Sequence, residues 1–208
     1  MDGPIDICSH KRSGTHLLAA SIWKNFELPD LTVRAVVHSG KKFVMGSKMW
    51  TTGDRVDIPW GGLWRSHNFF NPPWFKDPKR VLYIIRNPVD TLVSFWRFLD
   101  PLCKDDLEVH FGKGRVAFWL KHVRGYTDNC RWVRYEDLVG DKHDEVLDQI
   151  AEWFDLTARV DTYQRVVGRV GWYSSESPVK SKRPTKTILR MIEKNFPDEF
   201  LGYSVDGG

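Results

Sequence analysis

The sequence predicts an α/β protein whose central, mostly parallel β-sheet is flanked by helices. Apolar runs at residues 5–8 and 81–85 predict strands, and the second has the unbroken apolar character of a buried parallel strand. A helical pattern follows each run, and strands that alternate with helices are typical of a parallel sheet. The chain has 208 residues, enough for a substantial core, and we assign residues 1–208 to a single domain.

Periodicity and chain breakers predict the other elements. Asn87 has the character of an N-cap and Pro88 that of a first helical residue, so a helix is expected from there to about residue 99. An apolar face repeats through residues 146–154, as in an amphipathic helix. The remaining predictions are strands at 31–37, 63–67 and 131–135, helices at about 17–26, 115–125, 158–167 and 188–196, and loops over most of 38–62, 100–113 and 168–186.

Composition limits the function classes. Hydrophobic residues make up 41% and charged residues 28%, which fits a soluble globular protein. The net charge of +4 is too mild to indicate nucleic-acid binding, but it suits an anionic ligand. The three cysteines have neither disulfide nor metal-site spacing, so a reducing compartment is expected. Because no signal peptide or long apolar run is present, we predict no transmembrane segment and expect a cytoplasmic protein, with an excised domain as the alternative.

Residues 9–16 form a polar loop between a predicted strand and a predicted helix. Such a loop directs backbone N–H groups and the helix N-terminus to one place, which suits phosphate or sulfate. An ordinary turn with exposed basic residues is the alternative. The string lacks the Walker A pattern, so a P-loop-type kinase is a weaker alternative. The candidate contacts are charges on Lys11 and Arg12, hydroxyls on Ser13 and Thr15, and close backbone approach at Gly14.

A second polar string, residues 86–94, follows the buried strand at 81–85. Arg86 is expected at the carboxyl end of that strand, where α/β proteins bind ligands. An arginine grips phosphate through paired N–H donors. Ser94 is expected two turns along the helix that starts there. Taken alone, an arginine such as Arg86 is more commonly just a surface residue at a strand end.

These strings resemble the cytosolic-type sulfotransferase family. Residues 12–15, Arg-Ser-Gly-Thr, match its 5′-phosphosulfate loop, and residues 86–94 match every fixed position of its 3′-phosphate signature, R-N-P-x-D-x-x-x-S. Residues 65–67, Arg-Ser-His, match the string that supplies its catalytic base, and residues 135–138 match its Y-E-D-L segment. The resemblance implies a single-domain, P-loop-like sulfotransferase fold. It also implies the donor 3′-phosphoadenosine 5′-phosphosulfate (PAPS), whose product is 3′-phosphoadenosine 5′-phosphate (PAP).

The resemblance also implies residue roles. Arg86 and Ser94 would hold the 3′-phosphate, and Arg12 would neutralise charge on the leaving phosphate. His67 would take the proton of the acceptor hydroxyl, with Arg65 near the sulfuryl oxygens. No metal is required, and the Y-E-D-L segment is expected to be structural. The 5′ end would be held by Arg12, Ser13, Gly14, Thr15 and His16.

The chain departs from the family pattern at a few positions. Lys11 replaces a proline, His16 replaces a threonine or asparagine, and Leu17 replaces the tryptophan that stacks near adenine. The family's C-terminal R-K-G-x-x-G-D-W loop has no clear counterpart, so a non-catalytic phosphoadenosine-binding module stays a second alternative. The basic residues that could close over the nucleotide are Arg169, Lys180, Lys182 and Arg183.

The acceptor is not specified beyond a hydroxyl or an amine. Aromatic residues between 50 and 74 surround His67 in the sequence, and they could stack on a sugar, enclose an apolar alcohol or belong to the core. Histidines without a motif are expected at the surface. These are His10, His38, His110, His122 and His143.

Overall fold

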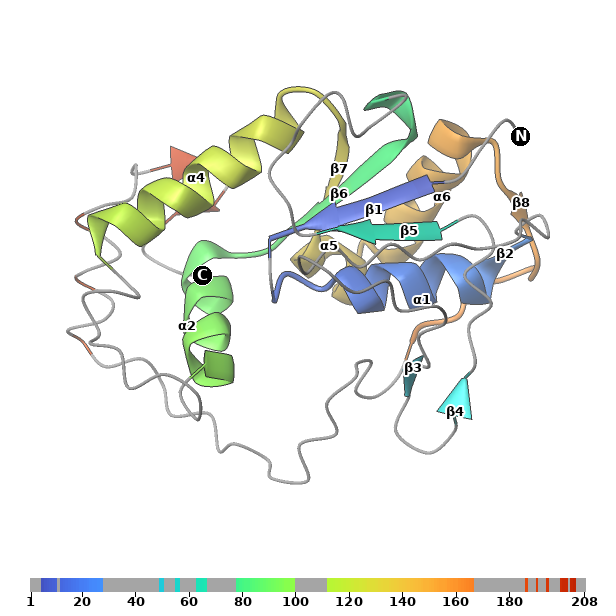
Figure 1. The fold of residues 1–208 in the computed structure, drawn as a ribbon. Helices are drawn as coiled ribbons and strands as arrows, with labels where there is room; N and C mark the ends of the chain where they lie inside the picture. Colours follow the sequence, from blue (N-terminus) through green and yellow to red (C-terminus); the bar gives the residue numbers. More distant parts are fainter. Residues whose placement is uncertain are drawn as a thin grey trace, which may run out of the picture.

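The centre of the protein is a four-stranded parallel sheet with the strand order β5-β1-β6-β7 (Figure 1). The strands are β1 Ile5–Ser9, β5 Leu63–Ser66, β6 Val81–Ile85 and β7 Arg131–Arg134. This confirms the predicted α/β class. The computed structural model describes residues 5–10, 12–27, 49–50, 55–56, 63–66, 78–99, 112–166, 186, 190, 194, 199–201 and 203–204.

Helices cover both faces of this sheet (Figure 1). Successive strand residues point to opposite faces, so Leu82 and Ile84 join one apolar cluster, whereas Val81, Tyr83 and Ile85 join the other. The first cluster contains residues of α1 Thr15–Asn25, α5 Tyr135–Val139 and α6 His143–Phe154. The second contains residues of α2 Pro88–Leu99 and α4 Lys113–Thr127. Cover on both faces explains the wholly buried β6.

Short elements complete the described structure. Three antiparallel pairs of two-residue strands are β2 Phe26–Glu27 with β8 Thr157–Ala158, β3 Met49–Trp50 with β4 Arg55–Val56, and β9 Glu199–Phe200 with β10 Tyr203–Ser204. A 3₁₀ turn, Pro78–Arg80, leads into β6. Within the described residues, none of the helices has the length and apolarity needed to cross a bilayer.

The helix expected at 158–167 is wrong. Its first residue belongs to β8, and the described residues 159–166 are not helical. Asn25 explains the difference, because it takes the hydrogen bonds that a helix would make internally. Its side chain bonds both the N–H (2.6 Å) and the C=O (3.0 Å) of Gln164, and its carbonyl accepts from the N–H of Arg159 at 2.8 Å.

Most other boundaries lie within a few residues of the prediction. The helix expected from residue 17 starts at Thr15, and the helix expected at 115–125 is α4, with two more residues at each end. The strand at 131–135 ends at Arg134, because Tyr135 begins α5. The strand expected at 31–37 and most of the helix expected at 188–196 lie outside the described residues.

The surface position expected for three histidines is wrong. His10, His122 and His143 are all buried, while His38 and His110 lie outside the described residues. The His10 ring packs edge-on against Phe95 of α2, and its centre lies 5.5 Å from that of His122. Nδ1 of His122 lies 3.0 Å from the hydroxyl oxygen of Tyr83, a partner distant in the sequence that a local pattern does not reveal.

Candidate anion-binding site

Three neighbouring strands end at one edge of the sheet. Cys8 of β1 pairs with Ser66 of β5 on one side and with Tyr83 of β6 on the other, in parallel register. The polar strings that follow these strands therefore start at the same edge, the usual place for ligands in α/β proteins. His67, the residue after Ser66 in the sequence, lies outside the described residues, as do residues 169–183.

The loop between β1 and α1 has an unusual backbone. Arg12 (φ 72°) and Gly14 (φ 98°) both adopt the left-handed conformation, which costs a non-glycine residue energy. A Cβ atom on Gly14 would lie 2.5 Å from Cδ2 of Tyr135, so glycine is required here. Gly14 precedes the first helical residue, Thr15, and its carbonyl accepts from the N–H of Leu18 at 3.0 Å. The first turn of α1, whose N–H groups have no acceptor within the helix itself, thus follows directly after this loop.

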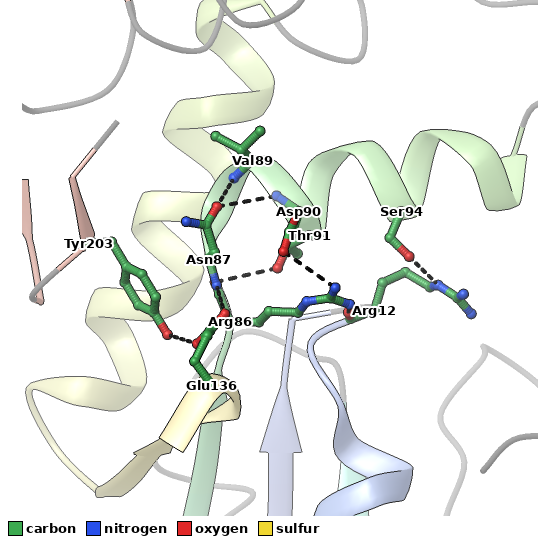
Figure 2. Close-up of polar contacts among 9 residues, drawn as sticks. All are labelled: Arg12, Arg86, Asn87, Val89, Asp90, Thr91, Ser94, Glu136 and Tyr203. Carbon is green, nitrogen blue, oxygen red and sulfur yellow. Dashed lines mark hydrogen bonds and ion pairs between the residues drawn. The ribbon is translucent and has the colours of Figure 1, made fainter. Parts of the chain in front are cut away.

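Side chains from the two polar strings meet at the sheet edge (Figure 2). Arg12 donates from Nε to Oγ of Ser94 at 3.1 Å, across 82 residues of sequence. Arg86 donates from Nη1 to the carbonyl oxygen of Arg12 at 3.5 Å. The loop after β1 and the helix after β6 therefore form one site, whose candidate ligand contacts are Arg12, Arg86 and Ser94.

The start of α2 fixes the backbone next to Arg86. Asn87 caps the helix as predicted, because its Oδ1 accepts from the N–H groups of Val89 (2.9 Å) and Asp90 (3.3 Å). The carbonyl of Arg86 accepts from the hydroxyl of Thr91 at 3.4 Å. Asp90 Oδ2 also lies 3.5 Å from Nη2 of Arg86, and its side chain is exposed. Arg86 therefore extends from a rigid strand-to-helix junction.

Tyr135 lies beneath both halves of the site. The guanidinium carbon of Arg86 lies 4.6 Å from the centre of its ring, and the same ring occupies the space beside Gly14. The Nε atom of Arg86 is buried and has no hydrogen-bond acceptor among the described residues. A buried donor without an acceptor is costly, and an anion at this place would satisfy it.

The electrostatics of the site also favour an anion. Partial burial of the Arg12 guanidinium and, to a lesser degree, the positive charge of Arg86 lower the pKa of Arg12. Arg12 stays protonated at neutral pH, since a guanidinium ordinarily titrates above ~12, so the charges of the two arginines repel each other. A phosphate or sulfate bound near them would relieve their mutual repulsion and form charge-assisted hydrogen bonds.

Comparison with known proteins agrees with this geometry. A family model of the sulfotransferase domain matches residues 2–186. The chain belongs to the sulfotransferase family. Sulfotransferase 6B1 of Gorilla gorilla gorilla is 36% identical over 80 residues, which are 31% of this chain and 26% of the relative. Sulfotransferase 2A2 of Rattus norvegicus is 33% identical over 88 residues, 36% of this chain and 31% of the relative. The alignments thus cover less than a third of either relative's length.

The fold is that of a sulfotransferase as well. The crystal structure of mouse sulfotransferase SULT7A1 complexed with PAP matches with a TM-score of 0.53 and 17% identity. The match covers 77% of this chain and 61% of that one. The predicted P-loop-like sulfotransferase architecture is confirmed.

The small residues of this sulfotransferase loop are mostly buried. Ser13 and Thr15 are buried, and His16 is partly exposed. The Ser9 hydroxyl donates to the carbonyl of His10 at 2.8 Å and contacts Oγ1 of Thr15.

Sequence reasoning missed a buried polar link behind the loop. Tyr83 accepts at its hydroxyl oxygen from the backbone N–H of His10 (3.1 Å), and the same oxygen lies 3.0 Å from Nδ1 of His122. The beginning of the loop is thus tied to β6 and α4.

Proposed function

We propose that the protein transfers a sulfuryl group from PAPS to an acceptor hydroxyl or amine. Membership of the sulfotransferase family supports this, and the contact between Arg12 and Ser94 carries it. That contact brings the 5′-phosphosulfate string and the 3′-phosphate string to one place. A donor with phosphates at both its 5′ and 3′ positions requires such an arrangement.

The residues at the sheet edge fit this donor. The left-handed Gly14 lets the Tyr135 ring pack directly against the loop, and the buried Nε of Arg86 lacks an acceptor among the described residues. In the proposed complex, Arg86 and Ser94 hold the 3′-phosphate. Arg12, Ser13, Gly14, Thr15 and His16 hold the 5′ end, with hydroxyl and backbone donors beside the charge of Arg12.

The proposed reaction is an in-line displacement at sulfur. The acceptor oxygen or nitrogen bonds to sulfur while the bond from sulfur to the bridging oxygen breaks, and PAP leaves. His67 takes the acceptor's proton. Arg12 stabilises the negative charge that grows on the bridging oxygen. Positioning and electrostatics carry most of the catalysis, by analogy with phosphoryl transfer.

Turnover with radiolabelled PAPS tests this proposal. Panels of phenols, aliphatic alcohols, sugars and amines are incubated with the labelled donor, and the products are separated. We expect transfer to at least one acceptor class and no phosphoryl transfer from labelled ATP. Binding of PAP without transfer to any panel would favour the non-catalytic module, and phosphoryl transfer from ATP would favour a kinase.

A further inference from the structure

The carboxylate of Glu136 joins two distant segments of the chain (Figure 2). Its Oε1 accepts from the backbone N–H of Asn87 at 2.9 Å. Its Oε2 accepts from the hydroxyl of Tyr203 at 2.6 Å. Glu136 stands in the Y-E-D-L segment at the start of α5, and Tyr203 belongs to β10 near the C-terminal end.

The Asn87 end of this bridge sets the direction of Arg86. The hydrogen-bonded N–H belongs to the peptide that joins Arg86 to Asn87. The side chain of Asn87 is already used in capping α2, so Glu136 supplies the separate acceptor for its backbone. A shift of this peptide would move the point from which Arg86 extends.

The Tyr203 end of the bridge is held firmly. Tyr203 is buried in the apolar cluster between the sheet and α4, and the guanidinium carbon of Arg134 lies 5.9 Å from its ring centre. Burial and the carboxylate of Glu136 raise the pKa of the Tyr203 hydroxyl, so it stays protonated and remains a donor. The carboxylate thus accepts one N–H and one O–H, and both partners hold it in one orientation.

We propose that Glu136 and Tyr203 are positioning residues for recognition of the 3′-phosphate, and that the C-terminal hairpin β9–β10 thereby takes part in the nucleotide site. The inference rests on the proposed role of Arg86 in binding that phosphate. Tyr203 acts through Glu136 and the Asn87 peptide, without touching the nucleotide. The β9–β10 hairpin would then contribute to nucleotide recognition indirectly, by fixing the strand-to-helix junction between β6 and α2.

The test compares two nucleotides that differ by one phosphate. Calorimetry measures the affinities of wild type and Tyr203→Phe for PAP and for adenosine 5′-phosphate. We expect Tyr203→Phe to weaken PAP binding by about 3- to 10-fold and adenosine 5′-phosphate binding by less than about 2-fold, the size of a modest hydrogen-bond effect. Equal losses for the two nucleotides, or none, would overturn the proposal.

Tyr163→Phe is the matched control. Tyr163 also donates a hydroxyl hydrogen bond to a carboxylate, that of Asp148, at 2.9 Å. It packs near Phe26, beyond the last residue of α1. In this variant, the ratio of the affinity for PAP to the affinity for adenosine 5′-phosphate should equal that of wild type. If wild type itself does not prefer PAP to adenosine 5′-phosphate, the proposed role of Arg86 fails, and the positioning proposal falls with it.

A measurement on wild type does not depend on the folding of any variant. Coupling between two sites is reciprocal. If the binding of a ligand depends on the Glu136 bridge, that ligand must in turn affect the bridge when it binds. We expect PAP, but not adenosine 5′-phosphate, to shift the NMR signals of the Asn87 amide and the Tyr203 ring, and to slow hydrogen exchange at Asn87. Signals that respond equally to both nucleotides would contradict the proposal.

Discussion

The guanidinium carbon of Arg86 lies 4.6 Å from the centre of the Tyr135 ring. The same ring fills the space beside Gly14, so one aromatic side chain supports both halves of the proposed site. The loop after β1 and the strand-to-helix junction after β6 are therefore coupled by packing as well as by hydrogen bonds. Changes on either side of this ring should affect nucleotide binding.

Gly14→Ala should weaken PAP binding by at least about 10-fold. The new Cβ would meet Tyr135 at 2.5 Å on a left-handed backbone, and such strain costs on the order of 1–3 kcal/mol. The control is Gly114→Ala in α4, where nothing lies within 4 Å of the new Cβ. It should keep wild-type affinity and raise the free energy of unfolding by about 0.5–1 kcal/mol. Unchanged PAP affinity in Gly14→Ala would contradict the proposed role of this loop in holding the 5′ end of the nucleotide.

Tyr83→Phe should weaken binding of both PAP and adenosine 5′-phosphate. The variant removes the hydroxyl that holds the N–H of His10 at 3.1 Å and so loosens the loop proposed for the 5′-phosphate. We expect a loss of about 5- to 10-fold, with lowered stability, because buried polar partners lose their bonds. Tyr126→Phe is the control, since its ring stacks on Tyr83 at 4.6 Å in the same cluster. If both variants lose stability but neither loses affinity, the hydroxyl serves stability alone.

Arg12→Ala should lower turnover by more than it lowers affinity for PAP. Charge on the bridging oxygen grows as the sulfuryl group departs, so the contact with Arg12 strengthens in the transition state. Arg12→Lys should retain part of the activity, because a point charge still helps. Steady-state kinetics and calorimetry on the same preparations separate the two quantities. An effect on affinity alone would remove Arg12 from the chemical step.

His67→Asn should lower turnover by roughly 10²- to 10⁴-fold, the usual range for a lost proton acceptor. PAP affinity should be nearly unchanged, because the base would face the acceptor. The wild-type rate should fall as the pH drops through the histidine titration, ordinarily near ~6.5, since an imidazolium cannot accept a proton. Thermal melts show whether the variant is folded. A folded variant with near wild-type turnover would exclude His67 as the base.

The secondary-structure predictions that were confirmed are those that depend on a single continuous stretch of sequence. The unbroken apolar run at 81–85 and the Asn87-Pro88 cap depend on neighbouring residues alone, and both are confirmed. The helix expected at 158–167 failed because Asn25, more than a hundred residues earlier, takes the backbone hydrogen bonds of Gln164. Periodicity contains no information on such a partner.

The site was predictable as two separate strings, but not as one structure. The motifs identified Arg12 and Arg86, whereas the support from Tyr135 and Glu136 depends on how β7 and α5 pack beside β6. For one of the buried histidines, His122, the sequence does contain a signal of burial. Trp119, His122 and Tyr126 recur at helical spacing, which places His122 on the apolar face of α4.

The central claim is that two strings of sequence form one site for a nucleotide with phosphates at both its 5′ and 3′ positions. Calorimetry of Arg86→Ala with PAP and with adenosine 5′-phosphate tests it most directly. We predict that the variant loses on the order of 1.5–3 kcal/mol of binding free energy for PAP and little for adenosine 5′-phosphate, because only PAP carries the 3′-phosphate that we propose Arg86 binds. Equal losses for the two nucleotides would contradict the claim.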